Sequence, residues 1–346
     1  MATTELDDAL GVFAGTAPEF GRHGLSNHGP MAAEVLSQLG RDDRIAAWTA
    51  DYAKNLKAAP APASRGLRDD EWPAALGESA RFPEWLTLFE TEMADRPPRA
   101  VVGEWIPRLV PGIVGAATHG MIRTAHALRS LGAADTPARR LEVAIGLAYW
   151  ASRYMELPGP PLLIGHQEVA QALADLPYLP EDTPDTFLIT DRVAHVADIA
   201  DEFEQAVASL GSNRGAEALL DALAVGGAEA YLRNAEDGNF IALLHTITAP
   251  LAVELVLPWL AEEDHDAALA YAWQAVAAIH VGYAIERHPV ALESEAPPSS
   301  NDVIAGAMTS GDPHALKLAE AALRCHARTG ESVLLLAAVD ASSRLG

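Results

Sequence analysis

The sequence predicts an all-α protein. Segments rich in Ala, Leu and Glu, with apolar residues three and four positions apart, recur along all 346 residues. Alternating runs of Val, Ile and Thr, which are typical of β-strands, are almost absent. A chain of this length can bury a large core and an interior pocket. We therefore expect one large multi-helix domain over residues 1–346, built from two packed helical halves.

The first elements are a short helix and a Gly-rich turn within residues 1–25, followed by the segment LSNHGPMAAEVLSQLGR. In that segment Ser26 or Asn27 would cap a helix, Pro30 suits its first turn, and Gly40 would end it. This places one histidine, of the NHGP sequence, at the N-terminus of a helix.

The later elements follow from the same periodicity and from the positions of Gly and Pro. In the first half, helices are expected around Trp48 and Tyr52, in short aromatic-bearing segments from Glu71 to Met93, from Gly112 to Leu131 after Pro107 and Pro111, and from Arg139 to Tyr154. A short helix with His166 and an amphipathic pair over residues 187–210 should follow. The last expected helices run from Glu217 to Asn234, around His245, around His280, and after Asp312. The Pro-rich stretch 157–186 is a candidate hinge or lid joining halves 1–156 and 187–346.

Charge and cysteine content exclude several classes of protein. The 48 acidic and 24 basic residues give a net charge of -24, which repels nucleic acid and anionic membranes. A single cysteine allows no intramolecular disulfide. The acidic N-terminus does not resemble a signal peptide, and no uninterrupted apolar run reaches the length of a membrane span. We expect a soluble cytoplasmic protein.

The most informative stretch is THGMIRTAHALRSL, from Thr118 to Leu131. His119 and His126 are seven residues apart, so on a helix their side chains point within about 20° of each other. Arg123 lies between them on the same stripe. If buried, this stripe is suited to a metal or an anionic substrate; the ordinary alternative is a pair of hydrogen-bonded core histidines.

Other histidines have weaker signals. His28 would feel the positive end of a helix dipole, which favours the neutral, metal-binding imidazole, although it could also be a simple turn residue. His245 lies in an apolar run, where it is either a ligand or a core histidine satisfied by Thr246 and Thr248. His280 occupies a similar apolar helix and is its main competitor.

Two further histidines have mainly structural interpretations. His195 is flanked by acidic residues, so it should be a partly exposed, paired imidazole. In GDPHALK, an Asp-Pro helix start places His314 and Lys317 three residues apart, on what is ordinarily a solvated helix face. The chain has no GxGxxG, Walker, HExxH, GxSxG or paired-cysteine motif and no paired ExxH, so nucleotide and flavin binding are unsupported.

Four motifs, in this order, resemble the questin oxidase-like family of polyketide and anthraquinone tailoring enzymes: LSNHGPMAAEVLSQLGR, ATHGMIRTAHALRSL, LLHTITAPLA and GDPHALKLAEAAL. The resemblance extends from about residue 15 to the C-terminus. It implies an α-helical oxygenase that opens a quinone ring in a Baeyer–Villiger-like or dioxygenase reaction. The family is flavin-independent and holds a non-haem iron in a central pocket that also binds the substrate.

The resemblance also implies the site residues. The iron ligands would be His28, His119, His126 and His245, with Lys317 at the position of a lysine that is carboxylated in part of the family. A carboxylated lysine offers anionic oxygen ligands suited to Fe(II). His314 would be a ligand, an orienting residue or a surface residue.

The expected reaction uses Fe(II) with open positions for dioxygen and a substrate oxygen. Arg123 would meet a phenolate or quinone oxygen as charge develops on it. Tyr149, Trp150 and Tyr154 would form a flat apolar wall for a polycyclic substrate.

Two other functions fit the same residues. One is an NADPH-assisted monooxygenase of the same family, for which oxygen uptake would require added reductant. The other is a catalytically inactive helical binding or scaffold protein without metal. The expected partners are an aromatic polyketide and dioxygen, without nucleic acid or membrane, and a homodimer is compatible with the sequence.

Overall fold

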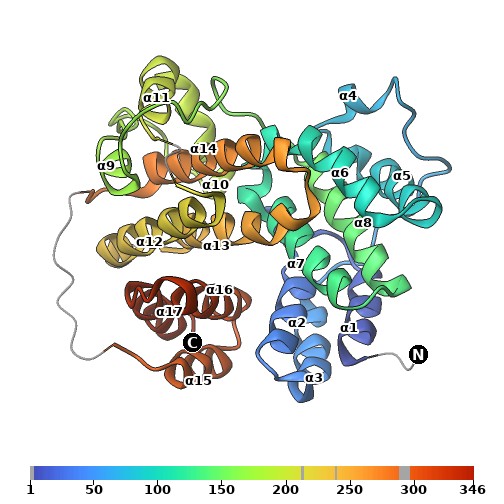
Figure 1. Ribbon diagram of the computed structural model, residues 1–346. Coiled ribbons are helices and arrows are strands. Elements are labelled where there is room, and N and C mark those ends of the chain that lie inside the picture. The colour runs from blue at the N-terminus through green and yellow to red at the C-terminus, as the bar shows by residue number, and fades with distance from the viewer. Residues whose placement is uncertain (1–3, 212–213, 238–239, 288–296) are drawn as a thin grey trace. The chain divides into compact units, whose positions relative to one another are not determined.

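The computed structural model describes residues 4–211, 214–237, 240–287 and 297–346. Over these residues the structure is helical, with one short hairpin of β1 (Glu19–Phe20) and β2 (Leu25–Ser26) and a few isolated β-bridges. The prediction of an all-α protein is confirmed (Figure 1).

The chain forms two compact units. Unit 1 consists of Met1–Glu156 and Leu255–Asp264, and unit 2 of Leu157–Glu254 and His265–Gly346. The Pro-rich stretch 157–186 is thus part of unit 2, and a short later segment completes unit 1.

Unit 1 is built around α7 and α8, which pack against each other, while α1 and α5 also pack on α8 and α2 packs on α7. Its helices are α1 (Glu5–Ala14), α2 (Gly29–Gln38), α3 (Asp42–Tyr52), α4 (Trp72–Ala75), α5 (Phe82–Asp95), α6 (Pro98–Leu109), α7 (His119–Ala133) and α8 (Pro137–Ser152), with 3-10 turns η1 (Ala53–Asn55), η2 (Ser79–Arg81), η3 (Val110–Gly112), η4 (Gly115–Thr118), η7 (Leu257–Trp259) and η8 (Glu262–Asp264).

The aromatic residues of this unit pack as the sequence predicts. Trp48 and Tyr52 stack one turn apart on α3, with ring centroids 4.9 Å apart. Trp105 of α6 meets Phe89 of α5 edge to face at 5.0 Å and Trp85 at 5.7 Å. Such contacts bury large apolar areas and fix the angle between the two helices.

The helix that carries His119 begins later than expected. A regular helix was predicted from Gly112, but α7 starts at His119. Ala116, Ala117 and Thr118 have positive φ angles, which a right-handed helix cannot contain. Pro107, which was expected to precede the next helix, lies inside α6 near its end.

Unit 2 is organised around α12, which packs on α9, α14, α16 and α17, and α15, α16 and α17 pack on one another (Figure 1). Its elements are α9 (Val169–Ala174), α10 (Ile189–Ala194), η5 (His195–Ile199), α11 (Ala200–Val207), α12 (Ala216–Asn234), η6 (Ala235–Asp237), α13 (Phe240–Val256), α14 (His265–Tyr283), α15 (Ser300–Ser310), α16 (Pro313–Thr329) and α17 (Val333–Arg344). His166 lies before α9 rather than in a helix, contrary to expectation.

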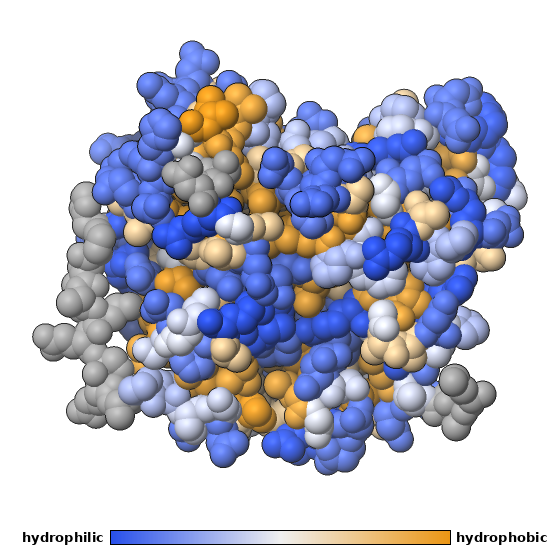
Figure 2. Space-filling view, viewed as in Figure 1, coloured by the Kyte–Doolittle hydropathy of each residue, from blue (hydrophilic) through white to orange (hydrophobic). Residues whose placement is uncertain are grey.

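One segment, Phe240–Trp259, is long and apolar enough to cross a membrane by length and composition. Inside the protein 72% of its most apolar window is buried, as is common for a core helix of a soluble protein. Figure 2 shows hydrophilic residues over most of one face, with apolar residues between them.

The contact between α7 and α8 can be tested at two glycines of α7. A Cβ at Gly120 would lie 2.5 Å from Cα of Trp150, so backbone would have to move. We expect Gly120→Ala to lower the free energy of unfolding by about 1–3 kcal/mol, measured by denaturant titration.

Gly132→Ala is the matched control. Its Cβ would meet only Cζ2 of Trp259 at 3.6 Å, an ordinary contact. Because alanine favours a helix over glycine, this variant should gain up to about 1 kcal/mol. Equal effects of the two substitutions would contradict the close packing at Gly120.

Candidate functional site

In unit 1, His28 and His119 form a buried pair. His28 is the residue before α2, as predicted, and its backbone N–H donates to the Tyr52 hydroxyl at 3.0 Å. Ser26 or Asn27 was expected to cap this helix. His28 occupies the N-cap position, and the Asn27 side-chain oxygen accepts the Gly29 backbone N–H at 3.0 Å. Gly29 has to be glycine, since a Cβ there would lie 2.3 Å from the Phe13 ring.

The ring contacts determine which nitrogen of His119 can bind a metal. Nδ1 of His119 lies 2.6 Å from the carbonyl oxygen of Ala116, which can only accept, so Nδ1 carries the hydrogen. The neutral ring then has its lone pair on Nε2, 2.7 Å from Nε2 of His28. Two imidazole nitrogens bound to one metal ion at about 2.1 Å lie about 3.0–3.4 Å apart, so the two rings are hydrogen-bonded at 2.7 Å and would separate by a few tenths of an ångström to bind one ion.

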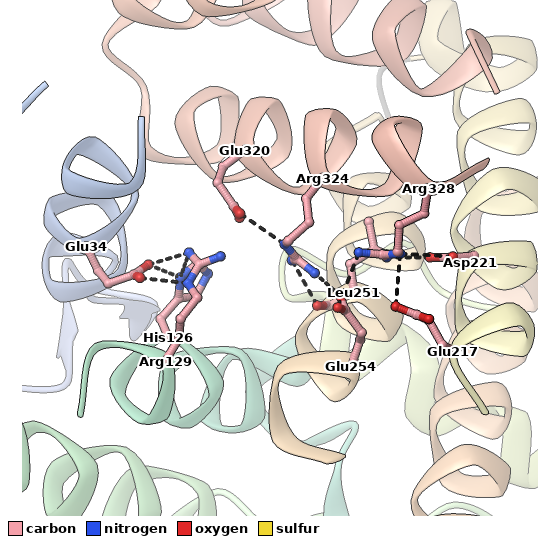
Figure 3. Close-up of polar contacts among 10 residues, drawn as sticks. All are labelled: Glu34, His126, Arg129, Glu217, Asp221, Leu251, Glu254, Glu320, Arg324 and Arg328. Atoms are coloured by element: carbon pink, nitrogen blue, oxygen red, sulfur yellow. Dashed lines mark hydrogen bonds and ion pairs between the residues drawn. The ribbon is translucent and has the colours of Figure 1, made fainter. Parts of the chain in front are cut away.

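His126 lies on the same helix as His119 and is also buried. Its Nδ1 is 2.7 Å from Oε2 of Glu34, and Arg129 binds both oxygens of that carboxylate (Figure 3). Burial would raise the pKa of Glu34, but the charge of Arg129 and the hydrogen bonds from His126 and Arg129 outweigh it and lower the pKa to about 2. An ionised carboxylate therefore orients His126, again with Nε2 as the lone-pair nitrogen of the neutral ring.

The structure confirms only part of the predicted pairing of His119 with His126. Within the part of the chain that the structure describes, His126 belongs to no set of three or more ligand atoms lying within 4.8 Å of one another. The common helix and the burial are as expected, whereas the partners of the two rings differ.

In unit 2, His245 of α13 is fully buried, and its Nδ1 lies 2.9 Å from the carbonyl oxygen of Ile241. Burial, together with the nearby charges of Lys317 and His314, lowers the pKa of His245 to about 3 and keeps the ring neutral. Thr246 and Thr248, the alternative partners of this ring, donate their hydroxyls to the carbonyls of Leu243 and Leu244.

His314 lies near His245, with ring centroids 6.1 Å apart. Asp312 caps α16, and its Oδ1 accepts both the backbone N–H of His314, at 2.7 Å, and the ring Nδ1, at 3.0 Å. One carboxylate thus starts the helix and orients the ring. Burial lowers the pKa of His314, although Asp312 opposes this shift.

Lys317 is 2% exposed, so the interpretation of this helix face as solvated is wrong for the lysine. The face is covered because α16 packs against α12, α15 and α17. Burial lowers the pKa of Lys317 to about 7, against the opposing effect of Asp312. A large fraction of this amine is therefore neutral near neutral pH.

Farther along α16, arginines and carboxylates form an ion network within unit 2 (Figure 3). Arg324 pairs with Glu320 and Glu254, and Arg328 reaches Asp221 at 2.5 Å and Glu254 at 3.2 Å. The network links α16 to α12 and α13, which supports the helix that carries His314 and Lys317.

Arg123 makes a buried ion pair with Glu142 of α8. Its Nε and Nη2 donate to the two carboxylate oxygens at 2.6 and 2.9 Å, and the side chain is 1% exposed. The third nitrogen, Nη1, is buried and has no hydrogen-bond partner within the described ranges. Two of the three guanidinium nitrogens of Arg123 thus serve the contact between α7 and α8.

The three aromatic residues expected to face a substrate occupy different surroundings. The hydroxyl of Tyr149 bonds Ser26 at 2.7 Å and Glu19 at 3.1 Å, and Nε1 of Trp150 donates to Gly112 at 3.3 Å. Both side chains are buried, whereas Tyr154 lies beyond the end of α8 with its hydroxyl on Glu156. Tyr149 and Trp150 therefore pack in the core of unit 1.

His195 and His280 contrast with the histidines above. His195 is partly exposed and pairs with Asp198 at 2.9 Å, as predicted. His280 is buried, and neither ring nitrogen has a hydrogen-bond partner among the residues that the structure describes. Burial and the charges of Arg287 and Arg233 lower its pKa to about 3, so it is a neutral imidazole that no oxygen orients.

The sequence did not reveal the oxygen atoms that orient the rings. Glu34 is 92 positions from His126, and the Ala116 carbonyl depends on an unexpected backbone conformation. Only Asp312 had a local signal, the Asp-Pro-His helix start. No protein-family model and no curated protein matches this chain.

The ion pair of Arg123 gives a stability prediction. Arg123→Met leaves the Glu142 carboxylate buried without its cation, so we expect a loss of about 3 kcal/mol or more in denaturant unfolding. The double variant Arg123→Met/Glu142→Leu should recover most of this loss.

Arg140→Met is the control for this experiment, since Arg140 pairs with Asp135 in a half-exposed position. It should cost less than about 1 kcal/mol. A double variant as unstable as Arg123→Met alone would show that the pair is not the source of the loss.

Lys317 gives a pH prediction for the metal-free protein without bicarbonate. Below pH 7 both the folded and unfolded chains hold the proton; between about 7 and 10.5 only the unfolded chain does. The free energy of unfolding should then rise with pH, by up to about 1.4 kcal/mol per unit. Lys317→Met should remove this contribution.

The measurement is best made between about pH 7 and 8.5. The lowered pKa values of His245 and His314 affect stability only below their ordinary value of 6.5. The raised pKa of Cys325 acts only above its ordinary value of 9.0. Equal slopes for the wild type and Lys317→Met would disprove the lowered pKa of Lys317.

Proposed function

We propose that this protein is a non-haem Fe(II)-dependent oxygenase that cleaves, or inserts oxygen into, a quinone or aromatic polyketide ring in secondary metabolism. The substrate class, the reaction and a pocket that holds metal and substrate come from the resemblance to the questin oxidase-like family. On the same basis the ligands are His28, His119, His126, His245 and Lys317, with His314 as a further candidate.

The observation that supports metal binding is the orientation of four imidazoles. The Nδ1 atoms of His119, His126, His245 and His314 each contact a carbonyl or carboxylate oxygen. Metal-binding histidines characteristically donate one ring N–H to such an oxygen, which fixes the tautomer and makes the other nitrogen the ligand. The donor set therefore fits a metal that imidazole ligands suit, including iron.

Lys317 fits the proposal through its burial. A neutral amine adds carbon dioxide and loses one proton, which converts the lysine into an anionic group with two oxygen atoms. Burial favours the neutral amine that this addition requires. Neutral histidines with one carboxylated lysine give the mixed nitrogen and oxygen donor set that suits Fe(II).

Bound Fe(II) would supply the activation of dioxygen and hold a substrate oxygen. The chain itself orients the ligands: Glu34 and Asp312 hold the Nδ1–H groups of His126 and His314. Burial keeps His245 neutral and thus able to bind a cation. In this proposal Arg123 uses Nη1, its nitrogen without an acceptor, to donate to a phenolate or quinone oxygen.

The test is metal analysis of the full chain, purified without a His tag and reconstituted anaerobically with Fe(II). We expect about one iron per chain, and loss of iron in His119→Ala and His245→Ala. His195→Ala is the matched control, because His195 is a partly exposed histidine paired with Asp198, and it should retain iron.

Oxygen uptake with a hydroxylated anthraquinone then tests the reaction. Uptake by the iron-loaded protein alone supports the proposal, whereas uptake that needs NADPH indicates the monooxygenase. Absence of iron in the reconstituted wild type would contradict the proposal and favour the metal-free binding protein.

A further inference from the structure

The turn before α7 has an unusual backbone. Ala116, Ala117 and Thr118 adopt φ angles of 48°, 52° and 66°. They are the non-glycine residues with positive φ in the described ranges, and they are consecutive. Residues with a Cβ avoid this left-handed region because the Cβ crowds the following carbonyl, and Thr118 is additionally β-branched. Such a conformation persists only where the surrounding structure imposes it.

The surroundings of the turn explain how it is held. A Cβ at Gly115 would lie 1.8 Å from the carbonyl oxygen of Arg153, so the chain passes directly against the end of α8. Ile113 forms a β-bridge with Met155 on the same side. Thr118 is completely buried, and its hydroxyl donates to the Ala117 carbonyl at 2.6 Å. The contacts of Ile113 and Gly115 before the turn, together with the burial of Thr118 at its end, thus maintain the turn.

The consequence of the turn is the direction of one carbonyl. In a continuous helix the Ala116 carbonyl would accept the backbone N–H four residues later. Here it accepts the backbone N–H of His119, three residues later, and also faces the His119 ring, with Nδ1 at 2.6 Å. The left-handed residues therefore replace the regular helix hydrogen bond by contacts to the backbone and ring of one residue, and that ring belongs to the buried pair with His28.

We infer that the left-handed turn Ala116–Thr118 is a positioning element that keeps the hydrogen of His119 on Nδ1 and presents Nε2 beside His28 as a ligand atom. Because a Cβ disfavours positive φ, the turn depends on these contacts, and a β-branched residue at position 117 would disfavour it further. The part of this inference that concerns a metal rests on the proposed function.

Substitutions of Ala117 in the full chain test the inference. Ala117→Val places a β-branched residue at positive φ, which disfavours the left-handed conformation, so the unfolding temperature should fall and the Ala116 carbonyl should lose its fixed direction. In the metal-free protein, ¹⁵N NMR of the histidine rings should then change from the Nδ1–H tautomer of His119 to a mixture of tautomers, with assignment from a His119→Ala spectrum, and Co(II) affinity should fall about 10-fold or more. Glycine accepts positive φ without strain, so Ala117→Gly should keep the Nδ1–H tautomer, and its unfolding temperature should stay the same or rise.

Ala125→Gly is the matched control, since Ala125 is buried in the regular part of the same helix. It should lower the unfolding temperature and leave the tautomer of His119 unchanged. The inference is overturned if Ala117→Gly lowers the unfolding temperature as Ala125→Gly does, or if His119 keeps a single Nδ1–H tautomer in Ala117→Val. A wild type that binds no Co(II) would refute the proposed function alone, because the tautomer is read without metal.

Discussion

Four histidines of the chain place a ring N–H on an oxygen acceptor, and this constraint shapes the regions around them. His119 and His245 use backbone carbonyls, and His126 and His314 use carboxylates. Each solution fixes the ring and makes Nε2 the lone-pair nitrogen of the neutral form. The caps, turns and ion pairs nearby serve largely to hold these oxygen atoms in place.

Placing these acceptor oxygens beside the rings costs folding free energy. The Glu34 carboxylate is buried and has to be neutralised by Arg129, while the Ala116 carbonyl depends on a strained turn. His280 shows the alternative, a buried ring that no oxygen orients. The four oriented rings thus differ from one that is simply enclosed by a helical core, and this difference is the physical basis of the proposed metal site.

Helix positions were largely predictable, and the errors have local causes. Periodicity and the Asp-Pro and Gly signals correctly placed α2, α8, α12 and α16 within a few residues. The start of α7 was missed because nothing in GAATHG indicates that two alanines and a threonine adopt positive φ. The α16 face was misjudged because Lys317, Glu320 and two arginines look solvated until neighbouring helices cover them.

The sequence by itself determined that the chain is helical, strongly acidic and equipped with histidines in apolar surroundings, since these properties depend on composition and on spacing within one helix. The tertiary structure alone decided which ring nitrogen carries the hydrogen, that Lys317 is buried, and that Arg123 pairs with Glu142. These features depend on atoms that lie far apart in the chain or on a single unusual turn, and neither kind of contact leaves a periodic pattern in the residues.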